Sequence, residues 1–251
     1  MVHNPYMKKR AQASLFVIIA ILIVAVILFI VFLTKNTNEK ITDQDIAKVK
    51  AYVQDCLQTK TNEGVDLIAK QGGYYKIIDN GLNFLEERTV YYLKNNQILI
   101  PTQEKIKQEL DSALEDKSKA CLQMQDYSLT SESCIANSEI DEEIEVIFNC
   151  PITLKKGSST TRIEGFYSQV DFSVPEMLNL SSQIANEYKK DPKYLCITCL
   201  DQIAAQKNIT ITAVPITNSV GSQYNATWFL INSTKKMGDQ YIIWRFATEL
   251  K

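Results

Sequence analysis

The chain has 251 residues, of which 27 are basic and 29 are acidic, so its formal net charge at neutral pH is −2. Residues 1–33 hold three basic and no acidic side chains, which leaves 24 basic and 29 acidic residues and a net charge of −5 beyond residue 33. Because binding to phosphate backbones needs a basic surface, this charge argues against nucleic acid as a partner.

Residues 13–33 form an apolar stretch in which Ser14 is the only polar side chain, and no charge, glycine or proline interrupts it. A helix of this length is roughly 31 Å long, enough to cross a hydrocarbon core of about 30 Å. A helix of a soluble core usually keeps a polar stripe. We therefore expect a helix over residues 12–33 that spans a membrane or packs against copies of itself.

The flanks of this stretch predict its orientation. Lys8, Lys9 and Arg10 precede it directly and should remain on the cytoplasmic side. Residues 1–11 are then a basic leader, residues 34–41 a polar linker, and everything beyond them lies outside the cytoplasm. An ordinary secretory signal has a shorter apolar part and a cleavage site after it, and the sequence shows neither.

The junction over residues 9–14 reads Lys-Arg-Ala-Gln-Ala-Ser and resembles the class III signal peptide of archaeal type IV pilins and archaellins. The resemblance implies that a prepilin peptidase cuts between Ala11 and Gln12, after the basic Arg10, and that the freed helices stack into a filament core. Phe16 stands where bacterial pilins usually carry Glu, an acid that archaeal relatives often lack. Uncleaved signal anchors begin with a similar junction, so a permanent anchor remains the alternative.

The outer part resembles an uncharacterised family of membrane-anchored surface proteins from small-celled archaea. The resemblance implies no function, but it implies a head larger than that of a typical pilin. It rests on the following segments: Cys56-Leu57, residues 71–74 (Gln-Gly-Gly-Tyr), Ile100-Pro101, Cys121-Leu122 and residues 241–247.

Residues 42–125 are expected to form a mainly helical subdomain. Apolar residues at spacings of three and four predict a helix over 42–60, with Thr42 or Asp43 as its N-cap. A second helical piece over 64–70 should stop at the paired glycines that follow it. The remaining elements are a short hairpin, with strands over 90–93 and 97–100, and a helix over 102–121.

Residues 126–251 are expected to form an α+β subdomain. Alternating apolar and polar residues predict a strand over 143–154, a turn, and a returning strand over 160–174. Two helices, over 175–190 and 193–206, and three strands, over 209–216, 224–231 and 241–247, complete the chain. The expected fold class is thus α+β, with the apolar helix followed by a disulfide-linked head of helices and a mostly antiparallel sheet.

All six cysteines follow the apolar stretch, which suits disulfides formed outside the cytoplasm. The sequence allows many connectivities, and we favour three pairs: Cys56–Cys121, Cys134–Cys150 and Cys196–Cys199. The last pair lies in a Cys-Ile-Thr-Cys motif, for which two other interpretations remain open. It could be a redox site, or half of a zinc site completed by the second pair.

Histidine is absent beyond His3, which excludes Ser-His-Asp and Cys-His nucleophiles from the outer part. Neighbouring carboxylates could still perform acid–base chemistry, but such clusters are usually solvated faces. We therefore expect no catalysis, no metal and no cofactor. The carboxylates in question are Asp43, Asp45, Glu86, Glu87, Asp141, Glu142 and Glu143.

Four Asn-x-Ser/Thr sequons are candidates for glycosylation if the head is exported: Asn179, Asn208, Asn225 and Asn232. Together these patterns predict a pilin-like surface subunit that associates through its N-terminal helix and presents its head for adhesion or cell contact. The alternative is an unprocessed, membrane-anchored protein whose head binds a partner or an envelope component. An extracytoplasmic hydrolase is disfavoured.

Overall fold

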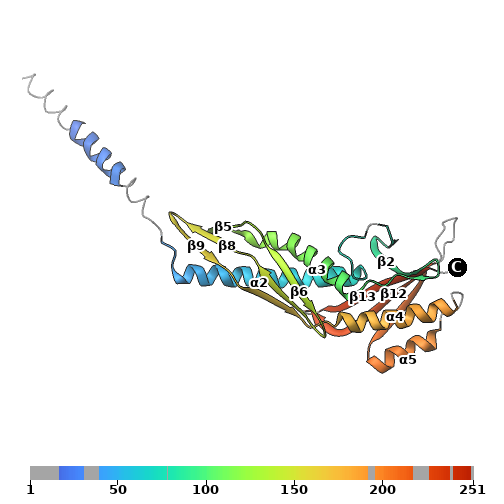
Figure 1. Ribbon diagram of the computed structural model, residues 1–251. Coiled ribbons are helices and arrows are strands. Elements are labelled where there is room, and N and C mark those ends of the chain that lie inside the picture. Colours follow the sequence, from blue (N-terminus) through green and yellow to red (C-terminus); the bar gives the residue numbers. More distant parts are fainter. Residues whose placement is uncertain are drawn as a thin grey trace, which may run out of the picture. The chain divides into compact units, whose positions relative to one another are not determined.

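The computed structural model describes residues 17–30, 40–77, 79–191, 196–216, 226–237 and 240–249. The chain divides into two units, Met1–Ile41 with Lys155–Thr160, and Thr42–Leu154 with Thr161–Lys251. Figure 1 shows the helices and strands of the second unit, which we call the head. The fold class is α+β with mostly antiparallel pairing and three disulfides, as the sequence predicted.

The described part of the predicted N-terminal helix covers residues 17–30, and all of its residues are exposed. The leader and both ends of the predicted span lie outside the described residues, so the full span stays a prediction. None of the helices within the described ranges combines the length and the apolar character that crossing a membrane requires.

Helix α2 (Asp43–Lys70) is one continuous helix, which corrects the prediction of two pieces. Thr42 and Asp45 form a capping box at its start, with Thr42 as the expected N-cap. Gly64 weakens the local helix signal, but the structure explains its presence. A Cβ on Gly64 would stand 2.8 Å from Leu114 Cδ2 of the neighbouring helix α3, so glycine permits this close approach.

Helix α3 (Gln103–Ser118) begins at the predicted N-cap, Thr102, and continues into a 3₁₀ turn, η1 (Lys119–Leu122). The predicted hairpin before it is also present, although its second strand is shorter than expected. Its turn residues, Asn95 and Asn96, both have positive φ, a conformation that asparagine tolerates well. The hairpin strands are β2 (Glu87–Lys94) and β3 (Gln97–Ile98), and an additional strand β1 (Gly81–Phe84) pairs with β2.

Within the described ranges the strands form three sheets. The largest has the order β1-β2-β13-β12-β11 with β3 added to β2, and its β13–β2 pair is parallel. This sheet joins strands from both sides of the subdomain boundary that we expected at residue 125. Its C-terminal strands are β11 (Thr210–Ile216), β12 (Ala226–Met237) and β13 (Gln240–Glu249).

The long hairpin predicted over 143–174 is instead four short strands, which is a correction. Pro151 lacks a backbone N–H and stands between the first two strands, and Gly165 has a φ of 78° between the last two. The chain therefore moves from one sheet to another at both positions. The strands are β7 (Ile144–Asn149), β8 (Ile152–Lys156), β9 (Ser159–Ile163) and β10 (Phe166–Val170).

The two smaller sheets have the orders β10-β7-β6 and β4-β5-β8-β9. Strand β6 was not predicted, although its residues alternate strictly between exposed and buried positions. The strands of these sheets that have not yet been given bounds follow η1 in the chain. These strands are β4 (Gln123–Met124), β5 (Tyr127–Ser131) and β6 (Ile135–Ile140).

Two helices follow β10 as predicted: α4 (Val174–Lys190) and α5 (Ile197–Lys207). Ser173 caps α4, and Pro175 occupies its first turn, where a missing N–H costs no hydrogen bond. Helix α4 contacts β13 and β2, and α2 contacts β13 and β10. The core between them contains a stack of Tyr92, Phe246 and Phe229, with ring centroids 4.8 and 5.1 Å apart.

Both edges of the sheet β10-β7-β6 are closed by helix side chains. On the β10 edge, the carboxamide of Gln54 bonds to the backbone N–H and C=O of Tyr167. Gln58, one helical turn later, does the same for Gln169, with N···O distances of 2.9 and 3.3 Å. A carboxamide has the same donor and acceptor as a peptide group, so the two glutamines take the place of a neighbouring strand.

Helix α3 closes the opposite edge in a similar way. Asp111 accepts the backbone N–H of Ser138 at 2.8 Å, and Gln103 donates to the backbone C=O of Ile140. The sheet is thus held between α2 and α3 without a free row of backbone groups at these positions.

Candidate functional site

The predicted processing and orientation residues, Lys8, Lys9, Arg10, Ala11 and Gln12, lie outside the described residues, as does Asn225. Their roles stay predictions. The site described below therefore lies in the head, where the disulfides, the carboxylates and the other sequons are found.

The three favoured cysteine pairs are confirmed as disulfides, and the described residues include no free cysteine. The zinc interpretation is wrong, because Cys134 and Cys150 are bonded to each other and cannot complete a site with the Cys-Ile-Thr-Cys motif. No cluster suited to a metal occurs among the described residues.

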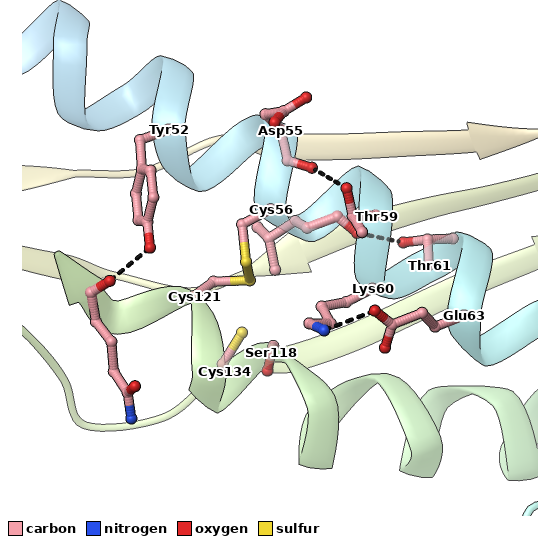
Figure 2. Close-up of a disulfide and its surroundings, with 12 residues drawn as sticks. Tyr52, Asp55, Cys56, Thr59, Lys60, Thr61, Glu63, Ser118, Cys121 and Cys134 are labelled. Atoms are coloured by element: carbon pink, nitrogen blue, oxygen red, sulfur yellow. Dashed lines mark hydrogen bonds and ion pairs between the residues drawn. A yellow bond between two sulfur atoms is a disulfide. The ribbon is translucent and has the colours of Figure 1, made fainter. Parts of the chain in front are cut away.

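The Cys56–Cys121 disulfide joins the middle of α2 to η1 (Figure 2), with 5.6 Å between the two Cα atoms. Cys134 lies beside this bond in Figure 2, and its disulfide to Cys150 joins the segment before β6 to the segment after β7. The first bond thus fastens α2 to η1, and the second, close to it, fastens the start of β6 to the end of β7.

Ionic and polar contacts surround this clamp. Tyr52 on α2 donates its hydroxyl proton to the backbone oxygen of Gln123 at 2.5 Å. Lys60 and Glu63 are paired at 2.7 Å, and Lys117 of α3 reaches Glu63 at 3.4 Å. The hydrogen bond from Lys60 lowers the pKa of Glu63, which keeps that carboxylate charged between the two helices.

A cavity of about 220 Å³ lies beside the two disulfides. Its floor is apolar and includes the buried side chains Val53, Leu57 and Ile152. Its rim carries Glu115 and Glu132, together with Asp116, which is already paired with Lys119 of the same rim at 3.0 Å. Such a cavity suits a basic side chain. The apolar floor would remove the stem of that side chain from water, and the acidic rim would attract its positive end.

Two of the carboxylates that the sequence suggested for chemistry, Asp45 and Glu87, take part in contacts that hold the fold. Asp45 caps α2 and also accepts the hydroxyl proton of Tyr127 at 2.7 Å. Glu87 forms an ion pair with the largely buried Arg245, whose guanidinium lies 5.3 Å from the ring centre of Trp228. These carboxylates hold helix ends and strands in place.

Sequence reasoning missed two other carboxylates, Glu109 and Asp111 of α3. Burial raises the pKa of Glu109, but Lys105 and the backbone N–H groups of Tyr75 and Lys76 outweigh it and hold that pKa below its ordinary value. Burial raises the pKa of Asp111, against the opposing hydrogen bonds from Ser138. Both bind backbone N–H groups of segments that are distant in sequence, which no local pattern of the sequence indicates.

Two predicted sequons lie close together, one at the end of α5 and the other on β12. Asn208 is exposed at the C-cap of α5, and Asn232 is the register partner of Thr210 in the β11–β12 pair. Both asparagines line one shallow surface hollow with Tyr241. Asn179 differs, because its sequon lies within α4 and the hydroxyl residue of that sequon, Ser181, is fully buried.

The described head thus brings together a disulfide clamp, an acidic-rimmed cavity and two neighbouring sequons. The cavity is formed by segments that are distant in sequence, and no local motif marks it. Comparison of the chain with protein-family models, with curated proteins and with solved structures found no match.

Proposed function

We propose that this chain is a pilin-like structural subunit of the cell surface, which assembles through its N-terminal apolar helix and presents the disulfide-linked head for adhesion or cell contact. The observation that carries the proposal is the helix over residues 17–30. Its twelve large apolar side chains are 44–63 % exposed.

Leaving these side chains in water is unfavourable. Full burial of one large apolar side chain contributes about 1.5–3 kcal/mol, so twelve half-exposed ones forgo on the order of 10 kcal/mol. A bilayer or the helices of neighbouring copies would recover this free energy. Packing between copies agrees with the junction over residues 9–14, which resembles a class III signal peptide and implies release of the helix from the basic leader.

The head is suited to an exposed structural role. One long-range disulfide fastens α2 to η1, the other fastens the start of β6 to the end of β7, and helix side chains close both edges of the three-stranded sheet. Closed edges prevent unspecific pairing of strands between subunits, which matters where heads are crowded on a surface. The carboxylates described above act as caps and ion-pair partners in this frame.

One observation favours the second candidate, an unprocessed anchored protein that binds a partner through its head. The cavity beside the disulfides has an apolar floor and an acidic rim, which suit a basic side chain of a partner protein. In this case the leader would remain on the chain and the helix would serve only as an anchor.

The two candidates are tested by mass spectrometry of the N-terminus of the protein isolated from its native cell. A mature chain that begins at Gln12 supports the pilin-like subunit, and electron microscopy of sheared surface material should then show filaments that contain it. Replacing Ala11 by a bulky Phe should abolish cleavage, whereas Lys8→Ala should leave it intact. A chain that retains residues 1–11 and fractionates with membranes would refute processing and favour the anchored protein. Recovery of the chain from the cytosol without detergent would refute both.

A further inference from the structure

The Cys196–Cys199 disulfide differs from the other two in exposure. Each of the long-range disulfides has one buried cysteine, Cys121 or Cys150, with at most 3 % of its surface exposed. Neither Cys196 nor Cys199 is buried. Thiols in solution therefore have access to this bond in the folded protein.

The same bond contributes the least to stability. It closes a loop with a sequence separation of 3, compared with 65 for Cys56–Cys121. In the loop-entropy model the stabilisation by a disulfide grows with the length of the loop that it closes, so Cys196–Cys199 stabilises the fold much less than Cys56–Cys121. Reduction of Cys196–Cys199 is thus compatible with a folded head.

The start of α5 stabilises a thiolate at Cys196. This residue is the N-cap of the helix, and its Sγ accepts the backbone N–H of Cys199 at 3.2 Å. Thr198 Oγ1 lies 3.5 Å from the same sulfur, and the first turn of α5 carries no acidic side chain. Amide donors and the helix dipole favour negative charge here, so Cys196 is the better leaving group of the pair.

Cys199 faces a polar groove of about 440 Å³ between α4 and α5. Four carboxamides line this groove: Gln183, Asn186, Gln202 and Gln206. Within the described part of the chain, no group forms a hydrogen bond with the side chain of Gln202 or Gln206. Carboxamides bind the backbone of an extended strand elsewhere in this head, where Gln54 and Gln58 pair with β10.

We propose that Cys196–Cys199 is a thiol–disulfide exchange site whose partner is an extended, cysteine-containing polypeptide held in the α4–α5 groove. The partner thiolate attacks Cys199 Sγ, a new S–S bond forms, and the Cys196–Cys199 bond breaks with its electron pair left on Cys196. A second thiolate of the partner then attacks the partner's first cysteine sulfur, which is bonded to Cys199 in the mixed disulfide, and releases Cys199 as a thiolate. The partner gains a disulfide, and the two cysteines of this chain are reduced by the same two electrons.

The first test measures selective reduction of the full chain in a mild detergent at neutral pH. Dithiothreitol is added, free thiols are alkylated at intervals, and peptides are mapped by mass spectrometry. We expect Cys196 and Cys199 to be labelled at least about tenfold faster than the matched pair Cys134 and Cys150, while near-ultraviolet circular dichroism stays unchanged. Equal rates, or labelling only when the dichroism signal is lost, would overturn the proposal.

The second test addresses the groove. Cys196→Ser leaves a free thiol at Cys199, which should form a stable adduct with a short polar peptide whose single cysteine is activated as a mixed disulfide. Adding Gln202→Ala and Gln206→Ala should slow this reaction at least about fivefold, the loss expected from two weak hydrogen bonds. The same changes should not alter the rate with bis(2-hydroxyethyl) disulfide, and Gln108→Ala on α3 serves as the control. A peptide rate unaffected by the groove changes would refute the polypeptide partner, whatever the role of the N-terminal helix.

Discussion

The glutamine pair on α2 gives the sharpest test of how this head holds its sheet. Gln54 and Gln58 each exchange two hydrogen bonds with one residue of β10. A net contribution of about 0.5–1.5 kcal/mol per hydrogen bond, taken at the low end for partly exposed groups, gives about 1 kcal/mol for each glutamine. The double change Gln54→Ala and Gln58→Ala should therefore lower the free energy of unfolding by about 2 kcal/mol.

A change of Gln58 to Glu separates the hydrogen bonds from the mere size of the side chain. At neutral pH the carboxylate faces the backbone C=O of Gln169 and has no proton to donate, so we expect a loss of about 1–2 kcal/mol. Only the protonated form can replace the carboxamide, so the folded state raises the pKa of the introduced carboxyl. The stability that this group contributes is then present below its unfolded pKa of about 4.3 and is lost as the pH rises through its folded pKa.

The assay is urea unfolding of the full chain in a mild detergent, followed by the fluorescence of Trp228 and Trp244, which are both buried in the head. Each variant is compared with the parent chain at pH 7 and pH 4, because other groups also titrate in this range. Gln44→Glu, at an exposed position in the first turn of α2, is the matched control. If Gln58→Glu and Gln44→Glu change stability equally at both pH values, the strand-like role of the glutamines is refuted.

Three further predictions concern the same head. Replacing both Cys56 and Cys121 by Ala should lower the free energy of unfolding by about 4 kcal/mol, because the loop they close is long. The urea midpoint should fall below that of the oxidised parent, and an unchanged midpoint would contradict this reasoning. Gly72→Ala should lower the free energy of unfolding in urea by about 1–2 kcal/mol, because Gly72 has a φ of 66° and a Cβ there would stand 2.8 Å from the backbone oxygen of Arg245. A variant more stable than the parent would show that the backbone moves freely to accept the Cβ. Glu109→Gln should lower the free energy of unfolding by about 1–2 kcal/mol at pH 7. Since the folded state lowers the pKa of Glu109, the difference in stability from the parent should shrink as the pH falls through that pKa. A difference that stays constant down to pH 3 would argue against the charged interaction.

Several elements of the head could be predicted because their signals are local. Thr42 and Thr102 cap helices where the sequence indicated, and α4 begins within one residue of the predicted position. The three terminal strands and the three disulfides were also expected. Caps, turns and apolar periodicity act within a few residues, so they can be read without knowing which segments meet.

The candidate site was not predictable in the same way. The cavity takes residues from α2, η1 and the segments beside β6 and β7, and no motif connects them. Gln54 and Gln58 look like ordinary surface residues until β10 is placed beside them. Exposure of Cys196, and the groove that Cys199 faces, likewise depend on where α4 and α5 lie.

By itself the sequence determined the apolar N-terminal stretch, the α+β class and most helix ends, whereas it only favoured the three cysteine pairs that the structure then established. The tertiary structure alone decided that α2 continues through Gly64, that the predicted hairpin after residue 143 divides between two sheets, and that β13 pairs in parallel with β2. The physical reason is that propensity and periodicity are short-range. The free energy that settles helix continuity, strand breaks and edge closure comes from contacts between segments far apart in the chain.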